Sequence, residues 1–225
     1  MTRRGMLTTG TALLAAAVIL GILVVTLPAG ATNALDVFWN NAMAQWREPW
    51  MLTAAHLLNR IGGGWIAALI VPVLVIATLV LVRRWRSAVF AAAAFIASAG
   101  LTQLLKQIFG RARPDDMLVA SDFGSFPSGH TANAATLAVV LWLVFPRVWV
   151  AVLGALWVLA MALSRTILSV HWITDTIGGA LVSAAAALLV AGMLVGWVSL
   201  GWTGPPGVAD AAPSRSPRAE DPTLP

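Results

Sequence analysis

Long apolar runs are the feature that most constrains how this chain of 225 residues can fold. Each has about twenty residues, enough for a helix to cross a hydrocarbon core of roughly 30 Å. The runs cover residues 6–27, 65–82, 88–108, 128–145, 148–163 and 171–198. Hydrophobic residues make up 59% of the chain and charged residues only 10%, which is outside the range of soluble proteins. Because helices satisfy their own backbone polar groups, we expect an all-α, polytopic membrane protein with six transmembrane helices.

The composition also excludes several kinds of chemistry. The chain contains no cysteine, which removes disulfides and thiolate metal ligands. Three histidines, His56, His130 and His171, do not suggest a polyhistidine metal cage, so we expect no metal and no cofactor. A pI near 11.5 would point to nucleic acid in a soluble protein. Here the basic residues lie at the ends of apolar runs, where they set membrane topology, and we expect no nucleic-acid partner.

The first apolar run has features of both a signal peptide and a membrane span. Arg3 and Arg4 precede it and small residues follow it, as in a secretory signal. Its length of about 22 residues exceeds the usual 7–15 of a signal core. We therefore predict a retained first span.

The segment 29–63 separates the first two runs and is more polar. Apolar residues recur in it at three- and four-residue steps, at Leu35, Phe38, Trp39, Ala42, Met43 and Trp46. Tryptophan prefers the membrane surface, so we expect an interfacial helix here, although a helix packed on the bundle explains the pattern equally well. Residues 1–202 would then form one membrane domain. Six of the twelve prolines fall within residues 203–225, which predicts a disordered tail.

Basic residues at the span ends suggest the orientation of the chain. Six spans put both termini on one face, together with Arg3, Arg4, Arg83, Arg84, Arg86 and Arg147. The other face also has six basic residues, Arg47, Arg60, Lys106, Arg111, Arg113 and Arg165. The basic pair beside the first span usually dominates, and the second set is mixed with acids. We therefore predict a multi-pass cell-membrane protein whose termini and tail are cytoplasmic and whose opposite face is extracytoplasmic.

Three polar clusters interrupt the apolar pattern at that opposite face. They are Lys106 with Arg113-Pro114, then Pro127-Ser128-Gly129-His130, then Ser164-Arg165 with His171 and Asp175. The first ends the third run, the second begins the fourth, and the third joins the fifth to the sixth. A six-span arrangement brings all three to one membrane face, which predicts a single functional site.

The basic members of these clusters suggest an anion. Lys106, Arg113 and Arg165 would place three positive charges at one spot, and an anion would relieve their repulsion. The Pro-Ser-Gly-His sequence is typical of a helix N-terminus, with Ser128 as the cap and Gly129 allowing a ligand to approach the backbone. Such a terminus offers free N–H groups and a positive dipole end to a phosphate.

The histidines supply reactive groups. His171 and Asp175 are four residues apart, so on a helix they share a face and the carboxylate can orient the imidazole as a nucleophile or base. His130 could be the matching acid. Positive charge, an in-line nucleophile and a proton donor are the set that phosphoryl transfer requires.

Each residue also has an ordinary structural interpretation. Lys106 alone could be a lysine reaching the interface, and the arginines could bind lipid headgroups. His171 and Asp175 could merely stabilise a helix. We assign His56 as an interfacial histidine without a role, and Arg111, Asp115 and Asp116 as solvated linker charges. Only the convergence of the clusters favours a site.

The three clusters together resemble the three-part motif of the type 2 phosphatidic acid phosphatase superfamily, whose membrane members include lipid phosphate phosphatases and undecaprenyl diphosphate phosphatases. All three spacings fit, over about 70 residues. The resemblance implies that His171 attacks phosphorus to form a phosphohistidine, Asp175 holds its ring, and His130 protonates the leaving oxygen. It further implies that Lys106, Arg113, Ser128, Gly129 and Arg165 hold the phosphate without a metal. Soluble vanadate-dependent haloperoxidases resemble this pocket, but this chain is not soluble.

We therefore expect a metal-independent phosphatase that removes a terminal phosphate from a membrane lipid phosphate or diphosphate, with undecaprenyl diphosphate as first choice. Phosphatidic acid, phosphatidylglycerol phosphate and other prenyl-linked phosphates come next. The competing hypothesis is a non-enzymatic membrane transporter or lipid-binding protein that uses the basic cluster for anions. The sequence does not determine the oligomeric state.

Overall fold

A computed structural model describes residues 1–26 and 31–197, and this part of the chain is helical with no β-strand. The elements are α1 (Arg3–Thr26), α2 (Ala31–Trp46), α3 (Pro49–Ile61), the short π-helical η1 (Ile66–Ile70), α4 (Val71–Leu81), α5 (Trp85–Phe109), α6 (Gly129–Val144), α7 (Val148–Ile167) and α8 (Ile173–Leu194). The all-α prediction is confirmed. The predicted tail, residues 203–225, lies outside the described residues.

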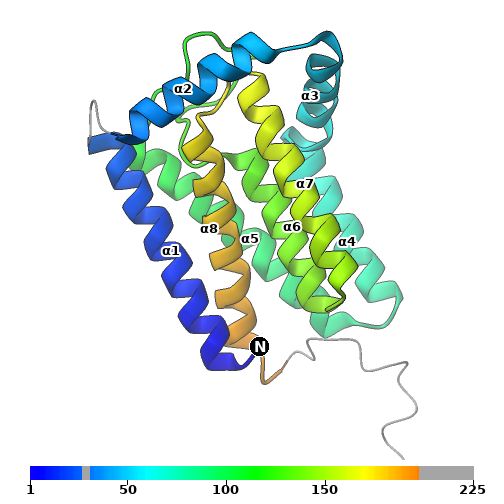
Figure 1. Ribbon diagram of the computed structural model, residues 1–225. Helices are drawn as coiled ribbons and strands as arrows, with labels where there is room; N and C mark the ends of the chain where they lie inside the picture. The colour runs from blue at the N-terminus through cyan, green and yellow to red at the C-terminus, as the bar shows by residue number, and fades with distance from the viewer. Residues whose placement is uncertain (27–30, 198–225) are drawn as a thin grey trace, which may run out of the picture.

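The helices form an elongated bundle with α2 lying across one end (Figure 1). By length and hydropathy, α1, α5, α7 and α8 can each cross a membrane. The segment η1–α4 forms a pair with α3, bent by 50°, that can count as a fifth crossing. At 16 residues α6 is shorter, although it runs alongside the others. The described residues thus contain four or five candidate spans, and the sixth stays a prediction.

Small side chains and a polar chain hold the middle of the bundle together. Ala91 and Ala94 of α5 are fully buried and pack in one cluster with residues of α6 and α8. Ser98 Oγ of α5 lies 2.8 Å from Ser183 Oγ of α8 and accepts a hydrogen bond of 2.7 Å from Thr136 Oγ1 of α6. Hydrogen bonds of this kind link helices in an apolar setting, where hydrophobic burial alone cannot.

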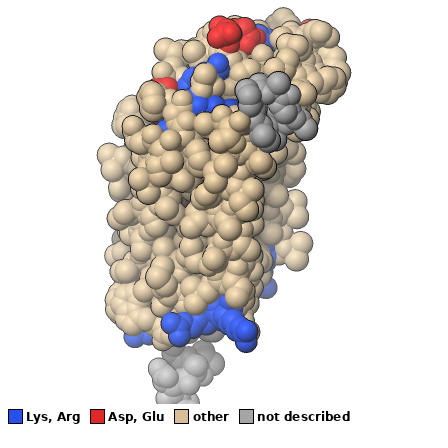
Figure 2. Space-filling model, turned by 90° about the vertical axis from the view of Figure 1, so that its left-hand side faces the viewer, with Lys and Arg blue, Asp and Glu red and all other residues tan. Residues whose placement is uncertain are grey.

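The two ends of the bundle differ in charge. Arg3 Nε donates to Gly192 O at 3.3 Å, which places the start of α1 and the end of α8 at the same end. Figure 2 shows only basic side chains at that end, an uncharged wall in the middle, and basic and acidic side chains together at the other end. The charge distribution matches the predicted division into two faces. The direction of the bundle across the membrane stays a prediction.

The predicted apolar stripe of α2 does not form one contact face. Met43 is buried against Ile167 and Leu168 beside a half-buried Trp39, whereas Leu35, Phe38 and Trp46 are exposed. The most deeply buried of the described α2 side chains is instead a carboxylate, Asp36. Helix α2 is therefore packed on the bundle through both apolar and polar contacts, and its placement at a membrane interface stays a prediction.

Candidate functional site

The Pro-Ser-Gly-His segment begins a helix, as predicted. Helix α6 starts at Gly129, with Ser128 as its N-cap in an extended conformation, after a cis peptide bond between Phe126 and Pro127. The Ser128 hydroxyl does not cap the helix; it accepts a hydrogen bond from Thr131 Oγ1 at 3.2 Å. A Cβ at Gly129 would meet nothing closer than Lys106 Cε at 4.0 Å, so the start of α6 is open on this side.

The starts of α6 and α8 are in direct backbone contact. Ser128 N donates to Asp175 O at 2.9 Å. Any Cβ at Gly179, in the second turn of α8, would collide with the Ser128 carbonyl oxygen. Glycine at this position therefore allows the second and third sequence clusters to lie side by side.

Two of the predicted cations share one loop. Lys106 is buried, and its Nζ donates to Gly124 O at 2.7 Å and lies 3.5 Å from Asp122 Oδ1. Arg113 Nη2 donates to the same two acceptors, at 3.0 Å to Gly124 O and 2.6 Å to Asp122 Oδ1. Burial alone would raise the pKa of Asp122, yet Lys106 and Arg113 together hold it below the usual value. Asp122 is therefore the ionised partner of both cations.

The third predicted cation has a neutral partner. Arg165 is only 1% exposed, and its Nη1 donates to Asn59 Oδ1 of α3 at 2.7 Å. Among the described residues no carboxylate lies within 4.0 Å of it, and its Nε is buried without a hydrogen-bond partner. Its charge is repelled by that of Arg113 and attracted by that of Asp122, which lies farther than 4.0 Å away. A buried guanidinium with an unused donor is costly unless an anion binds there.

His171 precedes α8 and lies between a cation and a carboxylate. Its Nε2 is 3.1 Å from Arg113 Nη1, and its Nδ1 is 3.4 Å from Asp175 Oδ2. The second contact is too long and poorly aligned for a hydrogen bond, and the described residues offer Nδ1 no better partner. Burial lowers the pKa of His171 to about 4, opposed by Asp175 and reinforced by Arg113 and Arg165. The imidazole is therefore neutral near pH 7.

His130 faces the break between α3 and η1. Its Nε2 lies 3.3 Å from Asn59 O, and a Cβ at Gly63 would collide with its ring. Asn59 thus contacts Arg165 through its side chain and His130 through its backbone. Gly63, within the glycine run 62–64, therefore provides the space for the His130 ring between α3 and η1.

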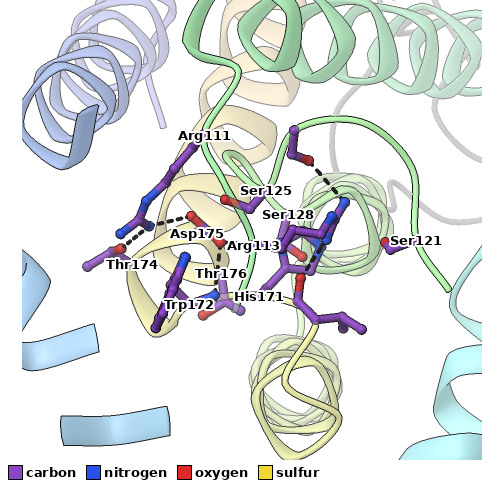
Figure 3. A network of polar contacts seen from close by, with 12 residues as sticks. Arg111, Arg113, Ser121, Ser125, Ser128, His171, Trp172, Thr174, Asp175 and Thr176 are labelled. Carbon is purple, nitrogen blue, oxygen red and sulfur yellow. Dashed lines mark hydrogen bonds and ion pairs between the residues drawn. The ribbon is translucent and has the colours of Figure 1, made fainter. Parts of the chain in front are cut away.

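Arg111 is not a solvated linker charge, and that prediction is wrong. Its side chain is 8% exposed and donates to Asp36 Oδ2 at 2.6 Å. It also donates to Asp175 Oδ1 at 2.6 Å (Figure 3). The segment after α5 runs beneath α2, so Arg111 is enclosed between α2 and the start of α8. Asp116 remains exposed but accepts from Asn40 Nδ2 at 3.0 Å and Ser169 Oγ at 2.9 Å.

The eight predicted site residues do lie at one end of the bundle. Lys106, Arg113 and His171 meet around the loop at Asp122, while Arg165 and His130 meet at Asn59. Asp175 joins the group through His171 and through the backbone of Ser128, next to Gly129. The sequence interpretation missed four contact residues: Asp36, Asn59, Arg111 and Asp122. The only available signal was Asp36, the first acidic residue in the chain, which stands alone between apolar neighbours.

The fold and the site define a helical, multi-pass membrane protein with buried cations and histidines at one end of its bundle. Residues 87–203 match the PAP2 superfamily, and the chain belongs to that family. The family prediction is therefore confirmed.

Curated relatives and a solved structure agree with this assignment. Phosphatidylglycerophosphatase B of Bacillus subtilis is 26% identical over 70% of this chain and 82% of its own length. Decaprenylphosphoryl-5-phosphoribose phosphatase of Mycobacterium tuberculosis is 31% identical over 64% of this chain and 80% of its own. The crystal structure of a transmembrane PAP2 type phosphatidylglycerolphosphate phosphatase from Bacillus subtilis has a TM-score of 0.74, at 24% identity over 84% of this chain and 97% of that one. The relatives are lipid phosphatases, and the structural likeness shows the shared fold.

Proposed function

We propose that this protein removes the terminal phosphate from a membrane lipid phosphate or diphosphate. The observation that carries the proposal is the charge of the site: Lys106 and Arg113 share one ionised carboxylate, Asp122, and the buried Arg165 has no carboxylate within 4.0 Å among the described residues. Together with Arg111, which pairs with Asp36 and Asp175, four cations meet three carboxylates, so one positive charge is left in excess, and Arg165 keeps a buried donor unused. A phosphate anion would balance the excess charge and occupy that donor.

In the proposed reaction His171 is the nucleophile. Its Nε2 forms a bond to phosphorus while the bond from phosphorus to the leaving oxygen breaks, and His130 gives that oxygen a proton. Asp175 faces Nδ1 and stabilises the positive charge that develops on the ring. Water then attacks the phosphohistidine, His130 takes a proton from it, and phosphate leaves. Arg113 Nη1 lies 3.1 Å from Nε2, so Arg113 must shift onto the phosphate oxygens before attack.

The cations provide the electrostatic stabilisation that a metal ion supplies in other phosphatases, so the proposed reaction is metal-independent. In the described part of the chain no group of three His, Asp or Glu side chains could hold a metal ion. Ser128 and Gly129 would present the start of α6 to the phosphate.

Two features support a lipid as the substrate. The wall of the bundle is uncharged in Figure 2 and exposes large hydrophobic side chains such as Leu153, Leu156 and Leu159, so a hydrocarbon tail can stay in the bilayer while the phosphate reaches the cations. The relatives named above act, by their names, on a phosphorylated glycerolipid and a phosphorylated prenyl lipid. A polyprenyl diphosphate such as undecaprenyl diphosphate is our first choice, followed by phosphatidylglycerol phosphate and phosphatidic acid. We propose that the site faces the extracytoplasmic side, because the charged side chains that Figure 2 shows at the opposite end, in the described part of the chain, are all basic.

The alternative is a transporter or lipid-binding protein that uses the cations without cleaving the ligand. Phosphate release separates the two. Purified protein in detergent with a chelator should release phosphate from a panel of prenyl and glycerolipid phosphates, and the His171→Ala variant should not. Release at the wild-type rate by His171→Ala would overturn the mechanism. Binding without release by the wild type would favour the alternative.

A further inference from the structure

We propose that Asp36 and Arg111 are positioning residues that hold the Asp175 carboxylate against His171. The inference rests on the proposed function, because it takes His171 as the nucleophile. Neither residue is expected to touch the substrate, and they act by fixing the group that orients the imidazole.

The contacts form a closed ring between α2 and the start of α8. Arg111 Nη1 donates to Asp175 Oδ1 and Arg111 Nη2 donates to Asp36 Oδ2, each at 2.6 Å. Asp36 in turn accepts from the backbone N of Thr174 at 3.1 Å and from Thr174 Oγ1 at 2.7 Å. Because Thr174 and Asp175 are neighbours, both ends of the ring are attached to the first turn of α8.

The ring fixes the direction of the Asp175 carboxylate. Its Oδ1 is bound by Arg111, so its Oδ2 must point the other way, where it accepts from Trp172 N at 2.9 Å and faces His171 Nδ1 (Figure 3). Without Arg111 the carboxylate could turn about its side-chain torsion, which is broad for aspartate. The Nδ1 contact, already 3.4 Å long, would then be lost in part of the molecules.

Asp36 has two effects in this arrangement. It prevents Arg111 from moving toward other acceptors by binding the second guanidinium nitrogen. It also satisfies a free N–H group in the first turn of α8, which Trp172, the N-cap residue, cannot do with its side chain. Trp172 Nε1 donates to Ala112 O at 2.9 Å, which holds the segment carrying Arg111 beside α8.

The charges make the ring sensitive to single substitutions. Asp36 and Asp175 are 0% exposed and share one guanidinium. Removal of Arg111 leaves two buried carboxylates without their cation, whereas removal of the Asp36 charge leaves Arg111 and Asp175 as a balanced pair. Arg111→Gln should therefore be more harmful than Asp36→Asn, and Asp36→Asn should partly restore an Arg111→Gln protein.

The experiment measures kcat and KM for phosphate release by Arg111→Gln, Arg111→Lys, Asp36→Asn and the Arg111→Gln/Asp36→Asn double variant. Activity is expressed per folded protein, determined by size-exclusion chromatography in detergent. For Arg111→Gln we expect kcat to fall by up to about 100-fold with KM near the wild-type value, because a misplaced reacting group costs about this much. Arg111→Lys, which cannot bind two carboxylates in a fork, should recover part of the loss. Arg147→Gln, at the opposite end, is the matched control.

Each outcome decides the proposal. A positioning role would be overturned if Arg111→Gln had the wild-type kcat. It would also be overturned if the fold decrease in kcat were matched by an equal fold increase in KM. A fall in thermal stability with unchanged kcat per folded molecule would mean that the contacts of Arg111 with Asp36 and Asp175 are only structural. If Arg111→Gln does not fold, wild-type kcat in both Arg111→Lys and Asp36→Asn would overturn the proposal, and a lowered kcat in both would support it. His171→Ala separates the two claims, because its activity tests the proposed function whatever the Arg111 variants do.

Discussion

Arg113 Nη1 lies 3.1 Å from His171 Nε2. A guanidinium can only donate, so Nε2 is the accepting nitrogen and the ring proton is on Nδ1, facing Asp175. The site therefore already holds the tautomer that a nucleophilic Nε2 requires. The same contact covers that nitrogen until a phosphate draws Arg113 away.

Replacing Arg113 with lysine should lower kcat/KM by roughly 100-fold or more. Lysine keeps the charge but loses the fork that contacts Asp122, Gly124 and His171 together. Steady-state phosphate release is the measurement, with Arg147→Lys at the opposite end as the control. Equal kcat/KM in Arg113→Lys and the wild type would show that charge alone is sufficient at this position.

Asp122 occupies the cations that a phosphate would use. Its side chain is 60% exposed, so its pairs with Lys106 and Arg113 are screened by water. Asp122→Asn should strengthen inhibition by inorganic phosphate by up to roughly fivefold, the factor that ~1 kcal/mol provides. An inhibition constant for phosphate that rises in Asp122→Asn would instead show that the carboxylate organises the site.

The rate should depend on pH on both sides of an optimum. Burial lowers the pKa of His171 to about 4, so the imidazole gains a proton and loses its lone pair only as the pH falls through that value. Below it, kcat/KM should fall by about tenfold for each pH unit. On the alkaline side kcat should fall as His130 loses the proton that it must donate, because the ring holds that proton only through the negative charge of the bound phosphate. A pH profile that is flat from acid to base contradicts this pairing.

Gly63→Ala should reduce activity strongly. A Cβ at this position collides with the His130 ring, so either the ring or the segment that connects α3 to η1 must move. A displacement of about 1 Å is expected to cost up to about 100-fold in kcat. Gly100→Ala is the matched control, since a Cβ there meets nothing within 4 Å and alanine favours the helix. Similar kcat values in the two variants would mean that His130 has no fixed place.

The orientation can be tested with reporters in living cells. A reporter fused after Trp202 should give a cytoplasmic signal, and one inserted beside the exposed Asp115 should give an extracytoplasmic signal. This follows from the end that carries Arg3 and the end of α8, where the described charged side chains in view are all basic. Reversed signals would place the site in the cytoplasm.

The convergence of Lys106, Ser128 and His171 could be predicted because each lies at the end of an apolar run, and antiparallel helices bring alternate run ends together. The start of α6 at Gly129 was likewise readable from local sequence. The start of a helix and the end of an apolar run are both determined by neighbouring residues, so they can be predicted without knowing the long-range contacts.

Arg111 could not be assigned in this way. It lies two residues before Arg113 in a charged linker, and only its contact with Asp36, 75 positions earlier in the chain, makes it a buried residue. Asn59 was missed for the same reason, since it meets Arg165 across 106 positions. Such contacts depend on how α2 and α3 fold over the end of the bundle, which periodicity does not specify.

The position of Asp36 on α2 also affects which part of the chain an active protein needs. The region that matches the family starts at residue 87, and it contains every cation and histidine of the candidate site. Two side chains that hold these groups, Asp36 and Asn59, lie outside it, in helices that cover the end of the bundle. A fragment limited to the matched region would keep the reactive groups and lose part of the framework that aligns them.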